Sequence, residues 1–158
     1  MDATELAGEL LLSVPANVTL GIRVDAAVDG HGAVSLDVPE HLTNVIGSLH
    51  ASGLAGLVDA CGLAAIISAM PDADSVRGLL PLGRAAQLQF YAPARGTLTA
   101  RCELTQDARD ELAGLSGPVR TDGPARTRRA RFCTETTIVA DDVAVAAGRF
   151  EWTVGRGD

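Results

Sequence analysis

One histidine and one aspartate stand nine positions apart in the long apolar stretch NVIGSLHASGLAGLVDACGLAAIISAM, residues 44–70. His50 precedes a helix-length run of small and aliphatic residues, and Asp59 lies in the middle of that run. A carboxylate in apolar surroundings loses hydration, so it is costly unless it is paired or used in chemistry. We therefore interpret Asp59 as a working acid. The alternative is a structural acid that caps or bridges to a neighbouring strand.

Two serines, Ser48 and Ser52, flank His50, so a Ser-His-Asp triad has to be considered. At about 1.5 Å rise per residue, Asp59 lies roughly 13 Å along the helix axis from His50, which argues against a triad within one chain. The chain also lacks a G-x-S-x-G elbow. Cys61 follows Asp59 by two positions and faces away from it, so we interpret this thiol as core packing.

The start of this helix is itself a candidate site for chemistry. The first N–H groups of a helix have no partner within the helix, and the helix dipole places its positive end there. The segment from Ser48 to Gly53 is therefore placed to stabilise negative charge on a carbonyl oxygen. Hydrolysis at a carbonyl carbon builds such a charge, and it also needs a base that activates water or a carboxylate that attacks directly.

Alternation of apolar and polar residues predicts the strands that must surround this helix. The expected strands form three hairpins: 19–28 with 34–38, 86–92 with 98–104, and 129–139 with 143–154. A short helix is expected over 3–13, and Pro15 follows it as a stop signal. Residues 106–128 break the alternation, and we expect a mobile excursion there that begins with a short helix over 107–115.

The helix within residues 44–70 is apolar on nearly all faces, so it needs other elements on every side. The economical solution is an α+β fold in which a curved antiparallel sheet of about six strands wraps around one long buried helix. A chain of 158 residues fits one such domain, 1–158. An open sheet has two edges that usually need cover or pairing, so we expect a homodimer or a dimer of dimers.

Composition narrows the classes of partner. The net charge of −7 disfavours nucleic acid, because phosphate backbones need clustered positive charge. The three cysteines are far apart and no Cys/His spacing is typical of zinc, so no metal site is expected. The odd cysteine count and the acidic N-terminus, without a signal peptide, predict a cytoplasmic protein. Asp59 and the lack of flanking Lys or Arg weigh against a membrane span over residues 45–70.

The order of elements and one motif together resemble the hotdog-fold thioesterase superfamily, and within it the PaaI-like acyl-CoA thioesterase branch. The motif residues are Asn44, Gly47, His50 and Asp59, in NVIGSLHASGLAGLVD. The stretch FYAPARG, residues 90–96, is also similar to the F-x-x-P-A-R-G turn of that family. The resemblance in layout covers nearly the whole chain, and identity to the motifs covers about a fifth of it.

The resemblance implies roles for individual residues. Asp59, supplied across a dimer interface, is expected to act as the catalytic base or nucleophile. Asn44 and His50 are expected to position the substrate or the attacking water. The oxyanion hole is expected to come from the backbone N–H groups of Ser52 or Gly53.

The resemblance also leaves alternatives open, because the chain departs from the family pattern after the histidine. The family often has two glycines there, and this chain has Ala51 and Ser52, whose side chains narrow the approach of a thioester to the backbone. Thioester hydrolysis is the leading expectation. A non-catalytic acyl-thioester binding module and a hydratase or dehydratase of the hotdog type are the alternatives.

The expected substrate is an acyl-CoA or an acyl-carrier-protein thioester, with no cofactor beyond the coenzyme A of the substrate. Every basic residue is arginine, which suits bidentate contacts with phosphate. We expect substrate contacts from Gly47 and Ser48 at the helix start and from Arg95, Arg128 and Arg129. A solvated strand entry is the alternative for the arginine-rich residues 126–131.

Overall fold

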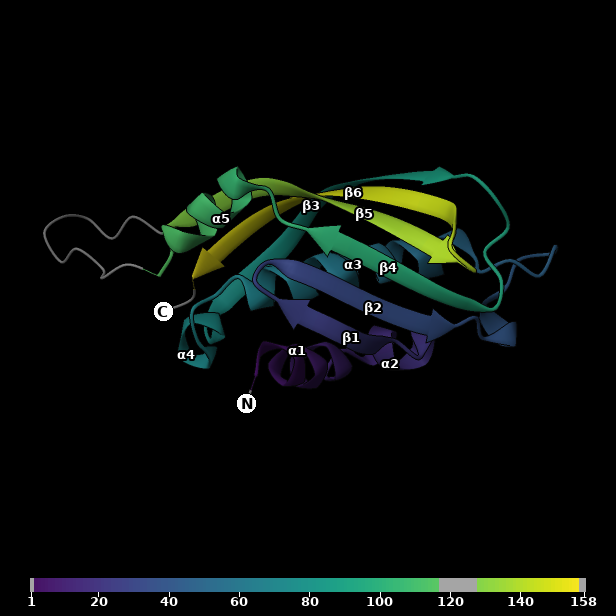
Figure 1. Ribbon diagram of the computed structural model, residues 1–158, viewed down its shortest axis with the longest axis horizontal. Coiled ribbons are helices and arrows are strands. Elements are labelled where there is room, and N and C mark those ends of the chain that lie inside the picture. Colours follow the sequence, from purple (N-terminus) through teal and green to yellow (C-terminus); the bar gives the residue numbers. More distant parts are fainter. Residues whose placement is uncertain (1, 117–127, 157–158) are drawn as a thin grey trace, which may run out of the picture.

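Figure 1 shows a six-stranded antiparallel sheet that arches over one long helix, α3. This computed structural model describes residues 2–116 and 128–156. The strand order is β1-β2-β4-β5-β6-β3. The strands are β1 Arg23–Val28, β2 His31–Asp37, β3 Leu79–Phe90, β4 Thr97–Glu103, β5 Arg129–Ala140 and β6 Val143–Arg156. The expected α+β architecture, a curved antiparallel sheet around one buried helix, is confirmed.

Helix α3 spans Ala51–Ser68, and its composition explains both its conformation and its position. Alanine and leucine, which favour helices, recur along it, and apolar residues occupy nearly every face. Twelve of its eighteen residues are buried. By length and hydropathy alone α3 is able to cross a membrane, but 67% of it is buried inside the protein, as in the core helix of a globular domain.

The core lies between α3 and the concave face of the sheet. Gly32 of β2 brings strand and helix together, because a Cβ at this position would lie 2.5 Å from the Cys61 carbonyl oxygen. Further across the same sheet, Trp152 of β6 is 2% exposed, and its Nε1–H donates to Thr134 Oγ1 at 2.8 Å. The helix is therefore fixed on the sheet by close backbone contact and by a satisfied polar group in the core.

The N-terminal segment differs from the prediction after residue 14. Helix α1 spans Ala3–Leu12, and a second helix, α2, spans Pro15–Leu20, where the expected strand over 19–28 already begins. Proline suits the first position of a helix, because its φ is fixed near the helical value and its missing N–H needs no partner there. Pro15 therefore starts α2, and β1 begins only at Arg23.

Strand β3 begins at Leu79, well before the expected start at 86, and it forms one edge of the sheet. It pairs with β6 and not with β4, which lies between β2 and β5, so the expected hairpin of 86–92 with 98–104 is wrong. Its first residues, LLPLG, do not alternate, and they include Pro81, a residue type that edge strands accept. None of its twelve residues is buried. Leu82 is 62% exposed and Phe90 is 56% exposed. The described part of the chain thus leaves a long free edge with apolar side chains.

Three short helices complete the fold: η1 Glu40–Leu42, α4 Ala73–Val76 and α5 Gln106–Ala113. Helix α4 follows α3 in the chain, and the Asp72 side chain caps it by accepting the N–H of Ser75. Helix α5 occupies the start of the expected excursion over 106–128. The remainder of that excursion includes residues 117–127, which lie outside the described residues.

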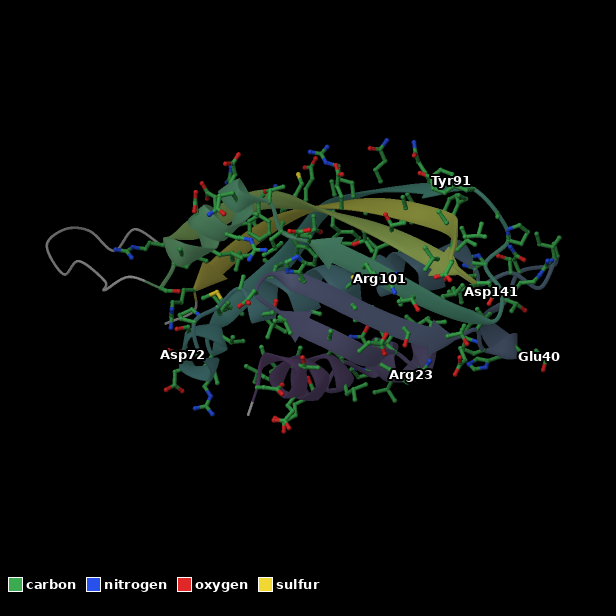
Figure 2. All side chains as sticks on the ribbon, viewed as in Figure 1. Arg23, Glu40, Asp72, Tyr91, Arg101 and Asp141 are labelled. Carbon is green, nitrogen blue, oxygen red and sulfur yellow. The ribbon has the colours of Figure 1, made fainter. Side chains whose placement is uncertain are left out.

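The molecule has two ends, which separate the start of α3 from its C-terminus. Figure 2 shows Glu40, Tyr91 and Asp141 at one end and Asp72 at the other. Because η1 precedes α3 and Asp72 follows it, α3 starts at the Glu40 end and finishes at the Asp72 end. The turn between β5 and β6 lies at the Glu40 end, so β5 begins at the Asp72 end.

Candidate active site at the start of the central helix

A tight turn, residues 44–48, leads into α3 and is held by the Asn44 side chain. Asn44 Oδ1 accepts the backbone N–H groups of Ile46 and Ser48, each at 3.1 Å. The Asn44 N–H in turn donates to the Ser48 carbonyl at 2.8 Å. Gly47 has a φ of 73°, a left-handed conformation that side chains disfavour. Asn44 and Gly47 thus build the turn that fixes where α3 begins.

The turn at residues 92–96 supports this segment from the neighbouring strands. Ser48 Oγ accepts the Ala94 N–H at 2.8 Å, and the Leu49 N–H donates to the Ala94 carbonyl at 2.8 Å. Arg95 Nη2 donates to the Ile46 carbonyl. Ser48 is buried, and its hydroxyl is used in the hydrogen bond with Ala94, whereas Arg95 is exposed and has further N–H donors for a ligand.

His50 is the N-cap of α3 and also contacts a serine hydroxyl. Its backbone has φ −61° and ψ 149°, and its Nδ1 accepts the Ser52 N–H at 3.2 Å. Ser52 Oγ lies 2.8 Å from the same nitrogen. Since Nδ1 accepts the backbone N–H, the ring proton is assigned to Nε2, and the Ser52 hydroxyl donates to Nδ1. Both side chains belong to exposed residues.

The N–H of Ala51 is the donor that the start of α3 leaves open. The expected oxyanion donors, Ser52 and Gly53, already have partners within the chain: the Ser52 N–H donates to His50 Nδ1, and the Gly53 N–H donates to the His50 carbonyl at 2.9 Å. Ala51 is exposed, and its N–H has no acceptor among the described residues. The geometry therefore moves the candidate donor from Ser52 and Gly53 to Ala51.

Asp59 lies on the one side of α3 that the rest of the described chain does not bury. The less buried residues of the helix recur at helical spacing and form a stripe, Ser52, Ala55, Gly56, Asp59 and Leu63. Asp59 is half-buried in this stripe, and its carboxylate has no hydrogen bond or ion pair among the described residues. Burial raises the pKa of the Asp59 carboxyl above its ordinary value.

The two halves of the candidate site do not meet within one chain. Ala51 and Asp59 are eight residues apart on a continuous helix, which corresponds to about 12 Å along its axis. The structure also places Arg128 and Arg129 far from the helix start, because they lie at the beginning of β5, at the Asp72 end. Arg128 Nη1 donates to the Gly114 carbonyl at 3.2 Å, next to α5.

The hollow beside α5 lies outside this site, and the described residues offer no candidate metal site. A hollow of about 700 Å³ runs along the outer face of the sheet beside α5, and none of the expected site residues lines it. No group of three or more His, Cys, Asp or Glu side chains in the described ranges is arranged to hold a metal ion. The chemistry available at the start of α3 is therefore that of an open N–H and a serine–histidine pair, and the Asp59 carboxylate lies about 12 Å further along the helix.

Sequence reasoning missed two features here, the open N–H of Ala51 and the contact between Ser52 and His50. A signal for the first was present, because the residue that follows an N-cap contributes an N–H that the cap side chain usually leaves unbound. The second depends on the side-chain rotamers of His50 and Ser52, for which the sequence contains no signal.

Comparisons with known proteins agree with this fold. The family model described as a domain of unknown function (DUF4442) matches residues 7–154 of the chain. Comparison with curated proteins finds no match. A protein of unknown function from Pseudomonas aeruginosa, described as a probable thioesterase, is 20% identical with a TM-score of 0.72, and the match covers 98% of this chain and 96% of that one.

Two further solved structures are similar over nearly their full lengths. A thioesterase family protein from Silicibacter pomeroyi is 20% identical, with a TM-score of 0.71, over 98% of this chain and 99% of that one. The PaaI protein of E. coli, from the phenylacetic acid degradation operon, is 19% identical, with a TM-score of 0.63, over 94% of this chain and 93% of that one. At these identities the likeness shows the fold, which is the expected hotdog fold.

Proposed function

The chain belongs to the family described as a domain of unknown function (DUF4442), and from its hotdog fold and its helix start we propose that it is a thioesterase. The substrate class is an acyl-CoA or an acyl-carrier-protein thioester. The observation that carries the proposal is the N–H of Ala51, an exposed residue, which has no acceptor among the described residues. A donor fixed at the positive end of a helix stabilises the oxyanion that thioester hydrolysis forms.

Asp59 is the proposed base. Proton transfer is most effective when the pKa of the base lies close to the working pH, and burial moves the Asp59 pKa upward, toward that range. Asp59 takes a proton from water as the water attacks the carbonyl carbon, or its carboxylate attacks directly. The carbonyl oxygen receives the Ala51 hydrogen bond, and the thiolate leaves.

The base comes from a second subunit in this proposal. Asp59 is about 12 Å along the helix from the Ala51 of its own chain, so one subunit does not present both groups to one carbonyl. Strand β3 offers a free edge of twelve residues, and pairing of two such edges produces a symmetric dimer. The half-buried stripe that carries Asp59 then faces the partner. Association of two dimers remains part of the proposal.

The arginines have separate places in this scheme. Arg95 adjoins the helix start through its bond to the Ile46 carbonyl and is placed to contact the substrate there. Antiparallel pairing of two β3 edges sets the beginning of β3 in one subunit beside its end in the other. This arrangement brings the Asp72 end of one subunit to the Glu40 end of the other, so Arg128 and Arg129 of one subunit lie at the same end of the dimer as the partner's helix start. We propose that these two arginines bind the phosphates of coenzyme A there.

Release of free thiol from a panel of acyl-CoAs tests the proposal. We expect turnover by the native protein and a fall in kcat of about 100-fold or more for Asp59→Asn. Asp74→Asn is the matched control, because Asp74 is an exposed acid whose partner is the exposed Arg77 on the same short segment, and it should leave the rate unchanged.

Three other outcomes would reject the proposed mechanism or function. Thiol release that Asp59→Asn leaves unaffected removes Asp59 from the reaction. Tight acyl-CoA binding without any thiol release identifies a binding module. A change in double-bond absorbance with enoyl-CoA substrates, without thiol release, identifies a hydratase or dehydratase.

A further inference from the structure

The pair formed by Ser52 and His50 has the geometry of an activated nucleophile. Ser52 Oγ lies 2.8 Å from His50 Nδ1, within the range in which a histidine takes the proton of a serine hydroxyl. The hydroxyl is not required for the cap, because the Ser52 backbone N–H already donates to Nδ1 at 3.2 Å. Both residues are exposed, so the hydroxyl is accessible to a substrate.

The open donor lies next to this hydroxyl. Ala51 and Ser52 are consecutive residues, so their Cα atoms are about 3.8 Å apart, and both belong to the first turn of α3. One thioester carbonyl is therefore able to present its oxygen to the Ala51 N–H and its carbon to Ser52 Oγ. A nucleophile, a base and an oxyanion donor around one position are the set that acyl transfer requires.

We propose that Ser52 accepts the acyl group from the thioester, with His50 as its base, before water completes the hydrolysis. This inference rests on the proposed function and adds a covalent step to it. Ser52 Oγ bonds to the carbonyl carbon while its proton passes to His50 Nδ1. The carbon–sulfur bond breaks, and the departing thiolate takes the proton from His50. The products are an O-acyl serine and a free thiol.

Water then hydrolyses the ester. The partner subunit's Asp59 takes one proton from the attacking water, and the new C–O bond replaces the bond to Ser52 Oγ. The proton held by that Asp59 passes to Ser52 Oγ as the ester bond breaks, and the carboxylic acid leaves. Each polar group at the site then has a separate role, in which Ala51 stabilises charge, Ser52 and His50 carry out acylation, and Asp59 carries out deacylation.

The experiment is a rapid acid quench of the protein mixed with a short-chain acyl-CoA, followed by intact mass measurement. We expect Asp59→Asn to accumulate one acyl group per chain, mapped to Ser52 by peptide sequencing, with one equivalent of thiol released. The double variant with Ser52→Ala should show no adduct. Ser52→Cys in the same background should keep it as a thioester that neutral hydroxylamine removes.

Two further variants separate chemistry from capping. His50→Asn in the Asp59→Asn background keeps a side-chain acceptor for the Ser52 N–H but provides no base, so it should slow adduct formation by about 100-fold or more. Ser13→Ala is the matched control, because Ser13 is an exposed serine whose hydroxyl donates to the Leu10 carbonyl and has no histidine beside it. It should leave both the adduct and its rate unchanged.

The outcomes distinguish this inference from the function on which it rests. Steady thiol release by the native protein with no adduct in Asp59→Asn, or full kcat in Ser52→Ala, overturns the covalent step and leaves the thioesterase intact. An adduct on Ser52 without net hydrolysis by the native protein supports the covalent step and rejects the hydrolase. Absence of both adduct and thiol release rejects both.

Discussion

The substitution Ala51→Pro isolates the open N–H at the start of α3 from the folding of the helix. Ala51 is the first helical residue, and its N–H has no acceptor among the described residues, so proline removes no hydrogen bond that the chain makes. Proline is favoured at this position, and it restricts the preceding residue to extended conformations. His50 already has ψ 149°, so the backbone accepts the change without strain.

These features set the expected magnitudes. The free energy of unfolding should stay within about 0.5 kcal/mol of the native value or rise slightly, because proline reduces the entropy of the unfolded chain. The rate should fall about 10²–10³-fold, the usual cost of losing one oxyanion donor. The measurements are kcat for thiol release from an acyl-CoA and urea unfolding at one protomer concentration.

Ala51→Gly serves as the control for this prediction, because it retains the N–H at the same place. It should keep most of the rate while losing about 1 kcal/mol of stability or less. A folded Ala51→Pro variant with unchanged kcat would show that the carbonyl oxygen binds elsewhere, and it would refute the reasoning from the open N–H.

Three other predictions concern stability and thiol chemistry. Asp59→Asn should raise the free energy of unfolding at neutral pH by about 0.5–2 kcal/mol, since the amide avoids the burial cost that raises the Asp59 pKa. The difference should vanish on acidification, as Asp59 becomes protonated in both states, and a variant less stable than the native protein would mark Asp59 as a structural acid. Asn44→Ala should cost about 1–3 kcal/mol in urea unfolding, because two backbone N–H groups lose their acceptor, whereas Asn44→Asp keeps both bonds. Burial raises the pKa of Cys102 to about 11 and raises that of Cys61 as well, so an aromatic disulfide at pH 8 should titrate one thiol, Cys133, in the native protein and three after unfolding.

Patterns of local sequence were enough to predict the fold because most elements show one clear pattern of apolar and polar residues. The alternation in β2, β4, β5 and β6 and the all-round apolar character of α3 specify a sheet around a helix. The predicted hairpin of 86–92 with 98–104 was wrong because alternation does not specify which strands pair, and β3 pairs with β6. The errors in element bounds occur where two sequence signals conflict. A proline such as Pro15 is typical both of the end of one helix and of the start of another. The start of β3 combines a proline with a run of leucines that does not alternate.

The site was predictable in outline and not in its hydrogen bonds. The sequence located the helix start and Asp59, since both depend on where α3 lies in the chain. Which N–H remains open depends on the cap that His50 makes, and that is a property of one side-chain conformation. The lack of a partner for Asp59 among the described residues was also beyond sequence reasoning, because it depends on every neighbour packed against α3.

The central claim is that one subunit supplies the helix start and the other supplies Asp59, and mixed dimers test it most directly. Ala51→Pro and Asp59→Asn should each be nearly inactive alone. When equal amounts are unfolded and refolded together, about half of the dimers contain one of each, and one of their two sites is intact, so about a quarter of the native activity should return. Activity that never exceeds the sum of the two variants would contradict a site shared between subunits.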